Sequence, residues 1–83
     1  MDIEFDPSKD QANIAKHGIS LSRAVELAGV VVVQDDRFAE PRFRLYGEID
    51  GLSYCAAVTM RGEVVRVINL RRAHAKEMRR HGF

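Results

Sequence analysis

The sequence contains one cysteine, two prolines and no tryptophan among its 83 residues. One cysteine, Cys55, excludes an internal disulfide, and we expect a buried, inert thiol. The longest apolar run, at 28–33, is far shorter than the about 20 residues that a membrane-spanning helix needs. The acidic start at 1–4 lacks the basic and apolar stretches of a secretion signal. We therefore expect a cytoplasmic protein without membrane association, made of one domain over 1–83.

The charges are distributed unevenly along the chain. Residues 1–60 carry six Lys and Arg against ten Asp and Glu, a net charge of −4, whereas residues 61–83 carry seven against two, a net charge of +5. Clustered positive charge favours a polyanionic ligand for the C-terminal third. A solvated basic helix explains the same charges equally well.

Capping residues and apolar spacing predict three helices. Asp6 and Pro7 are typical of a helix start, and Ser20 can cap a second helix with apolar residues at helical spacing. Gly18 and Gly29 can end these two helices. The helices are expected over 7–16, 21–28 and 72–81.

Turn residues and β-branched runs predict the strands. Asp50-Gly51 is a strong hairpin signal, and Arg61-Gly62 predicts a second tight turn. The run at 30–33 fits a strand covered on both faces. We predict an α+β fold, in which two N-terminal helices pack on an antiparallel sheet of three to four strands and a C-terminal helix follows. The candidate strands are 3–5 (an edge strand), 30–33, 42–49, 52–60 and 63–70.

Two-residue turns would also set the register of the central strands. The first turn pairs Arg44 with Ala57, and the second pairs Ala57 with Arg66. Two like charges beside a small residue are unfavourable unless an anion or a carboxylate lies between them. We infer either a shallow basic floor that seats a phosphate, or neutralisation by Glu40 or Glu77. The opposite face, which the helices should cover, carries Phe43, Leu45, Ala56, Val58, Val65 and Val67.

The reactive side chains suit RNA cleavage without a cofactor. No His or carboxylate cluster has the spacing of a metal site, and no glycine-rich loop precedes a helix. The Arg, Lys, His and Glu residues that remain suit attack of an RNA 2′-hydroxyl on its own phosphate. That reaction needs a base, an acid and cations around the phosphorus.

Three segments of the chain resemble the BrnT family of toxins. They are the opening Phe5-Asp6-Pro7-x-Lys9 with Asn13 and Lys16-His17-Gly18-Ile19-Ser20, the middle with Arg42, Gly47, Asp50-Gly51 and Thr59-x-Arg61, and the end Arg66-Val67-Ile68-Asn69-Leu70-Arg71-x-Ala73 with Glu77. Phe5 replaces the family's usual Trp, Pro41 stands at an acidic position, Asn69-Leu70 replaces Ser-Ala, and His81 stands where a tyrosine is common.

This resemblance implies a RelE-like fold and a ribonuclease toxin of a type II toxin-antitoxin system. It implies a BrnA-like antitoxin as partner, in a complex with two copies of each protein. Operator DNA would be bound only through that antitoxin. No cofactor or metal is implied.

Matching the segments to the family gives the candidate site residues. We expect His17, Arg61, Arg66, Glu77 and Arg80 to be catalytic, and Lys9, Lys16, Arg42, Arg71, Arg72, Lys76 and Arg79 to bind RNA phosphates.

Several of these roles have structural alternatives. His17 is the best candidate for a proton shuttle, or it caps a helix C-terminus. Arg66 contacts phosphate or pairs with Glu77, and Glu77 is either a base or the residue that orients an arginine. Asn13 is expected to hold the first helix to the sheet. The rival function is a non-catalytic module that docks an antitoxin or nucleic acid through its basic surface.

Overall fold

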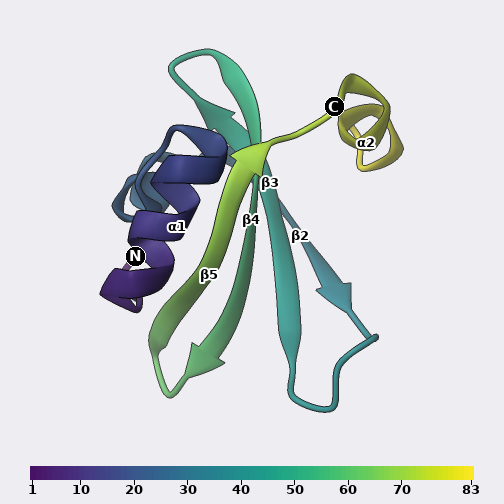
Figure 1. Ribbon diagram of the computed structural model, residues 1–83. Coiled ribbons are helices and arrows are strands. Elements are labelled where there is room, and N and C mark those ends of the chain that lie inside the picture. The colour runs from purple at the N-terminus through teal and green to yellow at the C-terminus, as the bar shows by residue number, and fades with distance from the viewer.

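Five strands form one mixed sheet in the computed structural model, which describes residues 1–83 (Figure 1). Their order is β1-β5-β4-β3-β2, with β1 parallel to β5 and the other pairs antiparallel. The expectation of an antiparallel sheet of three to four strands is wrong, because the short β1 adds a parallel strand at one edge. The bounds are β1 (Ile3–Glu4), β2 (Ala28–Asp35), β3 (Arg42–Ile49), β4 (Leu52–Arg61) and β5 (Val64–Arg72).

The first helix, α1 (Pro7–His17), forms as predicted. Asp6 accepts a hydrogen bond from the Ser8 amide at 2.8 Å, and Gly18 ends the helix with a φ of 72°. The side chain of Asn13 then fastens α1 to the sheet. Its amide nitrogen donates to the carbonyls of Ile19 at 2.9 Å and Leu70 at 2.8 Å, and its oxygen accepts from the Leu70 amide at 3.2 Å. The structural role expected for Asn13 is confirmed.

The second predicted helix is a shorter 3₁₀ helix, η1 (Leu21–Glu26). Three residues per turn bring Leu21, Ala24 and Leu27 to one side. Leu21 and Ala24 are fully buried, whereas Val25, which would share their face in an α-helix, is 50% exposed. Residue 28 already belongs to β2, so the predicted end at 28 is also wrong.

The main core lies between the sheet and the two N-terminal helical segments. The apolar face predicted from the strand pattern is confirmed, since Leu45, Ala56, Val58 and Val67 are buried and Phe43 and Val65 pack against them. The rest of this core consists of Ile19, Leu21, Ala24, Ile49 and Leu70.

The C-terminal helix, α2 (Ala75–Arg80), packs on the opposite face of the sheet (Figure 1). Met78 forms a second, smaller core with Tyr46, Cys55 and Ala73. The expected start at 72 is wrong, because Arg72 is the last residue of β5 and its Nε donates to the Ser53 carbonyl. No helix in the molecule has the length and apolar character needed to cross a membrane.

The register is as predicted at the first hairpin and different at the second. Arg44 lies opposite Ala57. The second turn is at Gly62-Glu63, so Arg61 pairs with Val64 and Arg66 lies opposite Thr59 rather than Ala57. A bulge beside Ala57 then brings Asn69 opposite it. Gly62, with a φ of 61°, takes the first turn position, which glycine favours in tight hairpins.

Strand β2 is an exposed edge strand, and the expectation that it is covered on both faces is wrong. Val32 is 60% exposed and Val30 40%. These side chains border an apolar hollow of about 480 Å³ that Phe43, Leu45 and Met60 also line. The short η1 leaves this end of the sheet uncovered.

Candidate functional site

Three adjoining hollows form what we call the basic groove. The His17 hollow, of about 500 Å³, lies where the C-terminus of α1 meets the end of β5. The Lys9 hollow, of about 150 Å³, shares Lys16 and His17 with it. The Ala57 hollow, of about 180 Å³, shares Arg71 with the first and Asn69 with the second. The polar residues of the basic groove are Lys9, Asn13, Lys16, His17, Asp35, Arg37, Arg42, Arg44, Asn69, Arg71, Arg72, His74 and Glu77.

His17 is the last residue of α1, and its ring reaches the sheet. Its Nε2 lies 3.5 Å from the amide nitrogen of Asn69 on β5. The Asn69 amide is also 3.4 Å from Asn13 Oδ1, the atom that fixes α1 to the Leu70 amide. The hydrogen bonds of Asn13 therefore set where the imidazole stands against β5. Lys16 precedes it and lines the same two hollows.

Arg71 and Glu77 form a bidentate ion pair at the centre of the basic groove. Arg71 Nη1 donates to Glu77 Oε1 and Nη2 to Oε2, both at 2.9 Å. The His74 amide also donates to Oε1 at 3.0 Å, and the Tyr46 hydroxyl lies 3.4 Å from Oε2. These donors, Arg71 first, lower the pKa of the Glu77 carboxyl to about 2. Glu77 is thus ionised and holds the guanidinium in one orientation.

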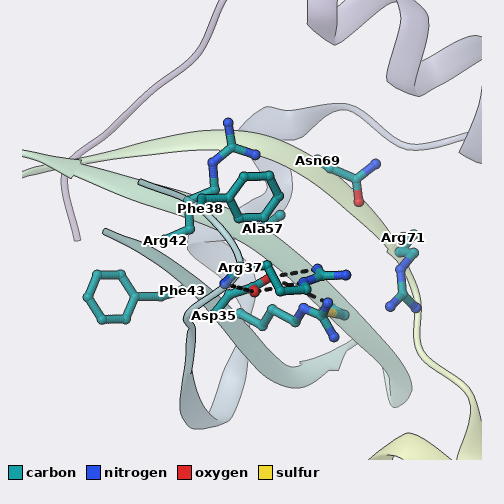
Figure 2. Close-up of a pocket in the computed structure, with 10 residues that line it drawn as sticks. Asp35, Arg37, Phe38, Arg42, Phe43, Ala57, Asn69 and Arg71 are labelled. Atoms are coloured by element: carbon teal, nitrogen blue, oxygen red, sulfur yellow. Dashed lines mark hydrogen bonds and ion pairs between the residues drawn. The ribbon is translucent and has the colours of Figure 1, made fainter. Parts of the chain in front are cut away.

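The Ala57 hollow is the basic floor expected from the sequence, but Asn69 rather than Arg66 lies beside Ala57. Ala57 lies between Arg44 on β3 and Asn69 on β5, and Arg42 and Arg71 stand at its corners (Figure 2). Carboxylates neutralise the charge of these arginines only in part. Glu40 pairs with Arg42 at 3.4 Å, and Asp35, which sequence reasoning missed, accepts from Arg37 at 2.7 Å and contacts Arg44 at 3.4 Å.

The structure brings together seven of the twelve predicted site residues, which line the basic groove: Lys9, Lys16, His17, Arg42, Arg71, Arg72 and Glu77.

The other five predicted residues lie outside the basic groove. Arg66 and Arg61 face Glu4 on β1, at 3.4 and 3.9 Å. The alternative pairing of Arg66 with Glu77 is wrong, since Glu77 binds Arg71. The three remaining residues, Lys76, Arg79 and Arg80, are exposed on α2, and Arg80 borders a separate hollow with Arg44 and Asp35.

Sequence reasoning missed five residues of the basic groove: Asp35, Asn69, His74, Phe38 and Arg37. Only the β4–β5 bulge brings Asn69 beside Ala57, and a bulge has no signature in this sequence. His74 and Phe38 lie outside the regular elements, where strand and helix periodicity gives no direction for a side chain. The one available signal was the mid-strand Asn69 itself, a polar residue among apolar neighbours.

Two further groups near the basic groove are buried. Cys55 is only 3% exposed, as expected, and burial raises the pKa of its thiol. Tyr46 stacks on the His81 ring with centroids 4.5 Å apart. His81 therefore packs against the sheet. No three His, Cys, Asp or Glu side chains group in a way that could hold a metal ion.

Comparison with known proteins identifies the family of the chain. The family model described as "Ribonuclease toxin, BrnT, of type II toxin-antitoxin system" matches residues 5–77. The 1.1 Å crystal structure of the Brucella abortus ribonuclease toxin BrnT is similar, with a TM-score of 0.74 and 29% sequence identity. The match covers 89% of this chain and 97% of that one. No protein with a curated description matches the chain in sequence. Because the family model spans nearly the whole chain, the protein belongs to the BrnT family of ribonuclease toxins of type II toxin-antitoxin systems.

Proposed function

We propose that the chain is an endoribonuclease that cleaves RNA by attack of a 2′-hydroxyl on the adjacent phosphate, without a metal ion, and so inhibits translation and growth. The observation that carries this proposal is the meeting of an imidazole, an ammonium and a guanidinium in one hollow, those of His17, Lys16 and Arg71. An imidazole can move a proton near neutral pH, and the two cations can stabilise the charge that develops on the phosphate.

The roles follow from the contacts of each group. His17 moves the proton of the attacking hydroxyl or of the leaving oxygen. Arg71 holds the phosphate, as a guanidinium can with two parallel donors. Glu77 positions Arg71 and is too weak a base to take the proton, because its pKa is about 2. Of the two roles that the sequence left open for Glu77, we therefore propose orientation of an arginine rather than that of a base.

The remaining predicted cations are proposed to bind the RNA on either side of the scissile phosphate. Lys9 and Arg42 extend the basic groove in two directions, and each contact with a phosphate adds salt-sensitive affinity. Arg72 lines the His17 hollow itself and is proposed to bind phosphate there. The residues assigned to more distant binding are Arg61, Arg66, Lys76, Arg79 and Arg80. Arg61 and Arg66 take this role rather than a catalytic one, because both face Glu4.

The partner is proposed to be a BrnA-like antitoxin that covers the basic groove, in a cytoplasmic complex with two copies of each protein. Support comes from family membership and from the positive charge of the groove, which an acidic segment of an inhibitor would complement. Binding of operator DNA would belong to the antitoxin. The relation to RelE-like toxins is also a proposal, supported by the antiparallel β2–β5 region and the flanking helices.

The rival function is a non-catalytic module that docks an antitoxin or nucleic acid. Expression in bacteria separates the two. If the chain is a ribonuclease, we expect the wild type and Arg23→Gln to arrest growth and His17→Gln and Arg71→Gln not to do so. Arg23 is a matched control, because it also pairs with carboxylates, Glu26 and Asp50, but lies on η1 outside the groove. Harmless expression of a folded wild type would favour the binding module.

A further inference from the structure

Apart from Arg71, the side chains that line the Ala57 hollow take no part in the chemistry proposed at His17. Four guanidiniums and one carboxylate line it, and the pairing of Glu40 with Arg42 and of Glu77 with Arg71 brings the local net charge to +1. The side chains come from three directions: Asn69 and Arg71 from β5, Arg42 from β3, and Phe38 and Arg37 from the β2–β3 loop (Figure 2). Each guanidinium has a carboxylate partner, but Arg37 and Arg44 share Asp35, so one positive charge remains that an anion would neutralise.

One donor in the hollow has no acceptor. The Nε of Arg42 is buried and makes no hydrogen bond, although its Nη2 reaches the exposed Glu40 at 3.4 Å. A buried N–H without a partner costs about 1–3 kcal/mol. A ligand oxygen would recover that loss if the Arg42 side chain turned toward it, because the Nε itself has almost no exposed surface.

An aromatic ring borders the same hollow. Phe38 is 43% exposed, and the Arg42 guanidinium lies 4.0 Å from its ring centroid. Unpaired RNA bases stack on aromatic rings and on guanidinium planes. Asn69, on the other side, carries an amide that can both donate to and accept from the edge of a base.

We propose that the Ala57 hollow binds one nucleotide unit of the RNA substrate, next to the scissile phosphate. Its phosphate lies against Arg42 and Arg44, above the small Ala57, and its base stacks at Phe38 within reach of Asn69. The inference rests on the proposed function, because Asn69 joins this hollow to His17 at 3.5 Å. It makes Phe38 and Asn69 determinants of which nucleotide precedes or follows the cut. An acidic peptide would satisfy the arginines but leave Phe38 and Asn69 without a use.

The experiment titrates the ¹⁵N-labelled full chain with nucleoside monophosphates and with inorganic phosphate. The signals to follow are the Arg42 Nε–H and the Ala57 amide. We expect both to shift with nucleotides at millimolar concentration and inorganic phosphate to bind more weakly. Phe38→Leu should weaken nucleotide binding about tenfold, the loss of one stacked base, and leave phosphate binding unchanged.

Two further variants test the site itself. Ala57→Leu fills the floor and should abolish binding of both probes, whereas Ala15→Leu, an exposed alanine of α1, is the size-matched control. Phe83→Leu is the matched control for Phe38→Leu, because Phe83 is also exposed, at 41%. Dispersed NMR signals of Ala57→Leu would show that the variant is folded, so that its loss of binding can be attributed to the filled hollow.

Three outcomes would overturn the inference. The first is no shift of the Arg42 signal, and the second is equal binding of phosphate and nucleotides that Phe38→Leu leaves unchanged. The third is that Phe38→Leu weakens binding of the antitoxin but not of nucleotides. Parallel cleavage assays separate its failure from that of the proposed function. Wild-type cleavage that Phe38→Leu does not alter rejects the nucleotide site and keeps the ribonuclease. Nucleotide binding by a wild type that cuts no RNA rejects the ribonuclease.

Discussion

Glu77→Gln changes one charge and almost no volume, and it tests the ion pair on which the basic groove depends. The carboxylate accepts two hydrogen bonds from Arg71 and one from the His74 amide, and its side chain is 19% exposed. The glutamine can accept from only one of the two guanidinium nitrogens and turns its own N–H donors toward the other. The substitution should therefore loosen both Arg71 and α2.

The size of the effect follows from the lowered pKa of Glu77. A fall from 4.5 to about 2 corresponds to about 3 kcal/mol at about 1.4 kcal/mol per pH unit, as an upper limit. The glutamine retains part of the hydrogen bonding, so we expect the free energy of unfolding to fall by about 2 kcal/mol. For a domain of this size the melting temperature should fall by about 10 °C.

Thermal unfolding followed by circular dichroism at pH 7 and at successively lower pH measures this effect. The folded carboxyl has a pKa below its unfolded value, so its contribution is complete above about pH 4.5 and is lost as the pH falls toward about 2. The two melting temperatures should therefore converge in acid. Glu26→Gln is the control, since Glu26 also binds an arginine through both oxygens but is exposed, and it should lower the melting temperature much less than Glu77→Gln does. Equal melting temperatures at pH 7, or a difference that persists at pH 2, would refute the reasoning.

Four other outcomes are expected. Asn13→Ala should lower the free energy of unfolding by about 2–4 kcal/mol, because the Leu70 amide and carbonyl lose their partner. Urea titrations measure this, and a loss below about 0.5 kcal/mol would contradict it. Gly47→Ala should cost about 1–3 kcal/mol in the same assay, since the added Cβ would lie 2.8 Å from the Ala28 carbonyl oxygen, and an unchanged urea midpoint would argue against the close approach. Iodoacetamide at pH 8 should leave Cys55 unmodified in the native chain and alkylate it in urea, because the thiol is buried with a raised pKa. Mass spectrometry measures this, and alkylation of the native chain would show that β4 opens. RNA affinity, measured by fluorescence anisotropy, should fall steeply between about 50 and 200 mM salt, and a flat response would exclude the phosphate contacts.

The sequence predicted those elements whose signals are local. The Asp6-Pro7 cap and the Asp50-Gly51 turn act within a few residues, and α1 and the register of β3 with β4 followed from them. The alternation of apolar residues likewise identified which sheet face is buried.

The errors arose where a distant contact decided the outcome. The turn at Gly62-Glu63 and the bulge beside Ala57 are settled by the fit of β5 to β4. The turn moves the partner of Arg66 from Ala57 to Thr59, and the bulge brings Asn69 to the floor. The 3₁₀ form of η1 follows from packing of Leu21 and Ala24 against the core, which sequence spacing alone reads as an α-helix. Pairing of Glu77 with Arg71 rather than Arg66 depends on where β5 ends, at Arg72.

The most direct test of metal-independent cleavage at His17 uses the purified chain, freed of any antitoxin, and an RNA in excess EDTA. We predict that the wild type and Arg23→Gln cut the RNA and leave a 2′,3′-cyclic phosphate, and that His17→Gln and Arg71→Gln do not. The same RNA with a 2′-deoxy nucleotide at the cut should resist cleavage there, because the nucleophile is missing. Loss of cleavage on addition of EDTA, or cleavage at the 2′-deoxy position, would contradict the account.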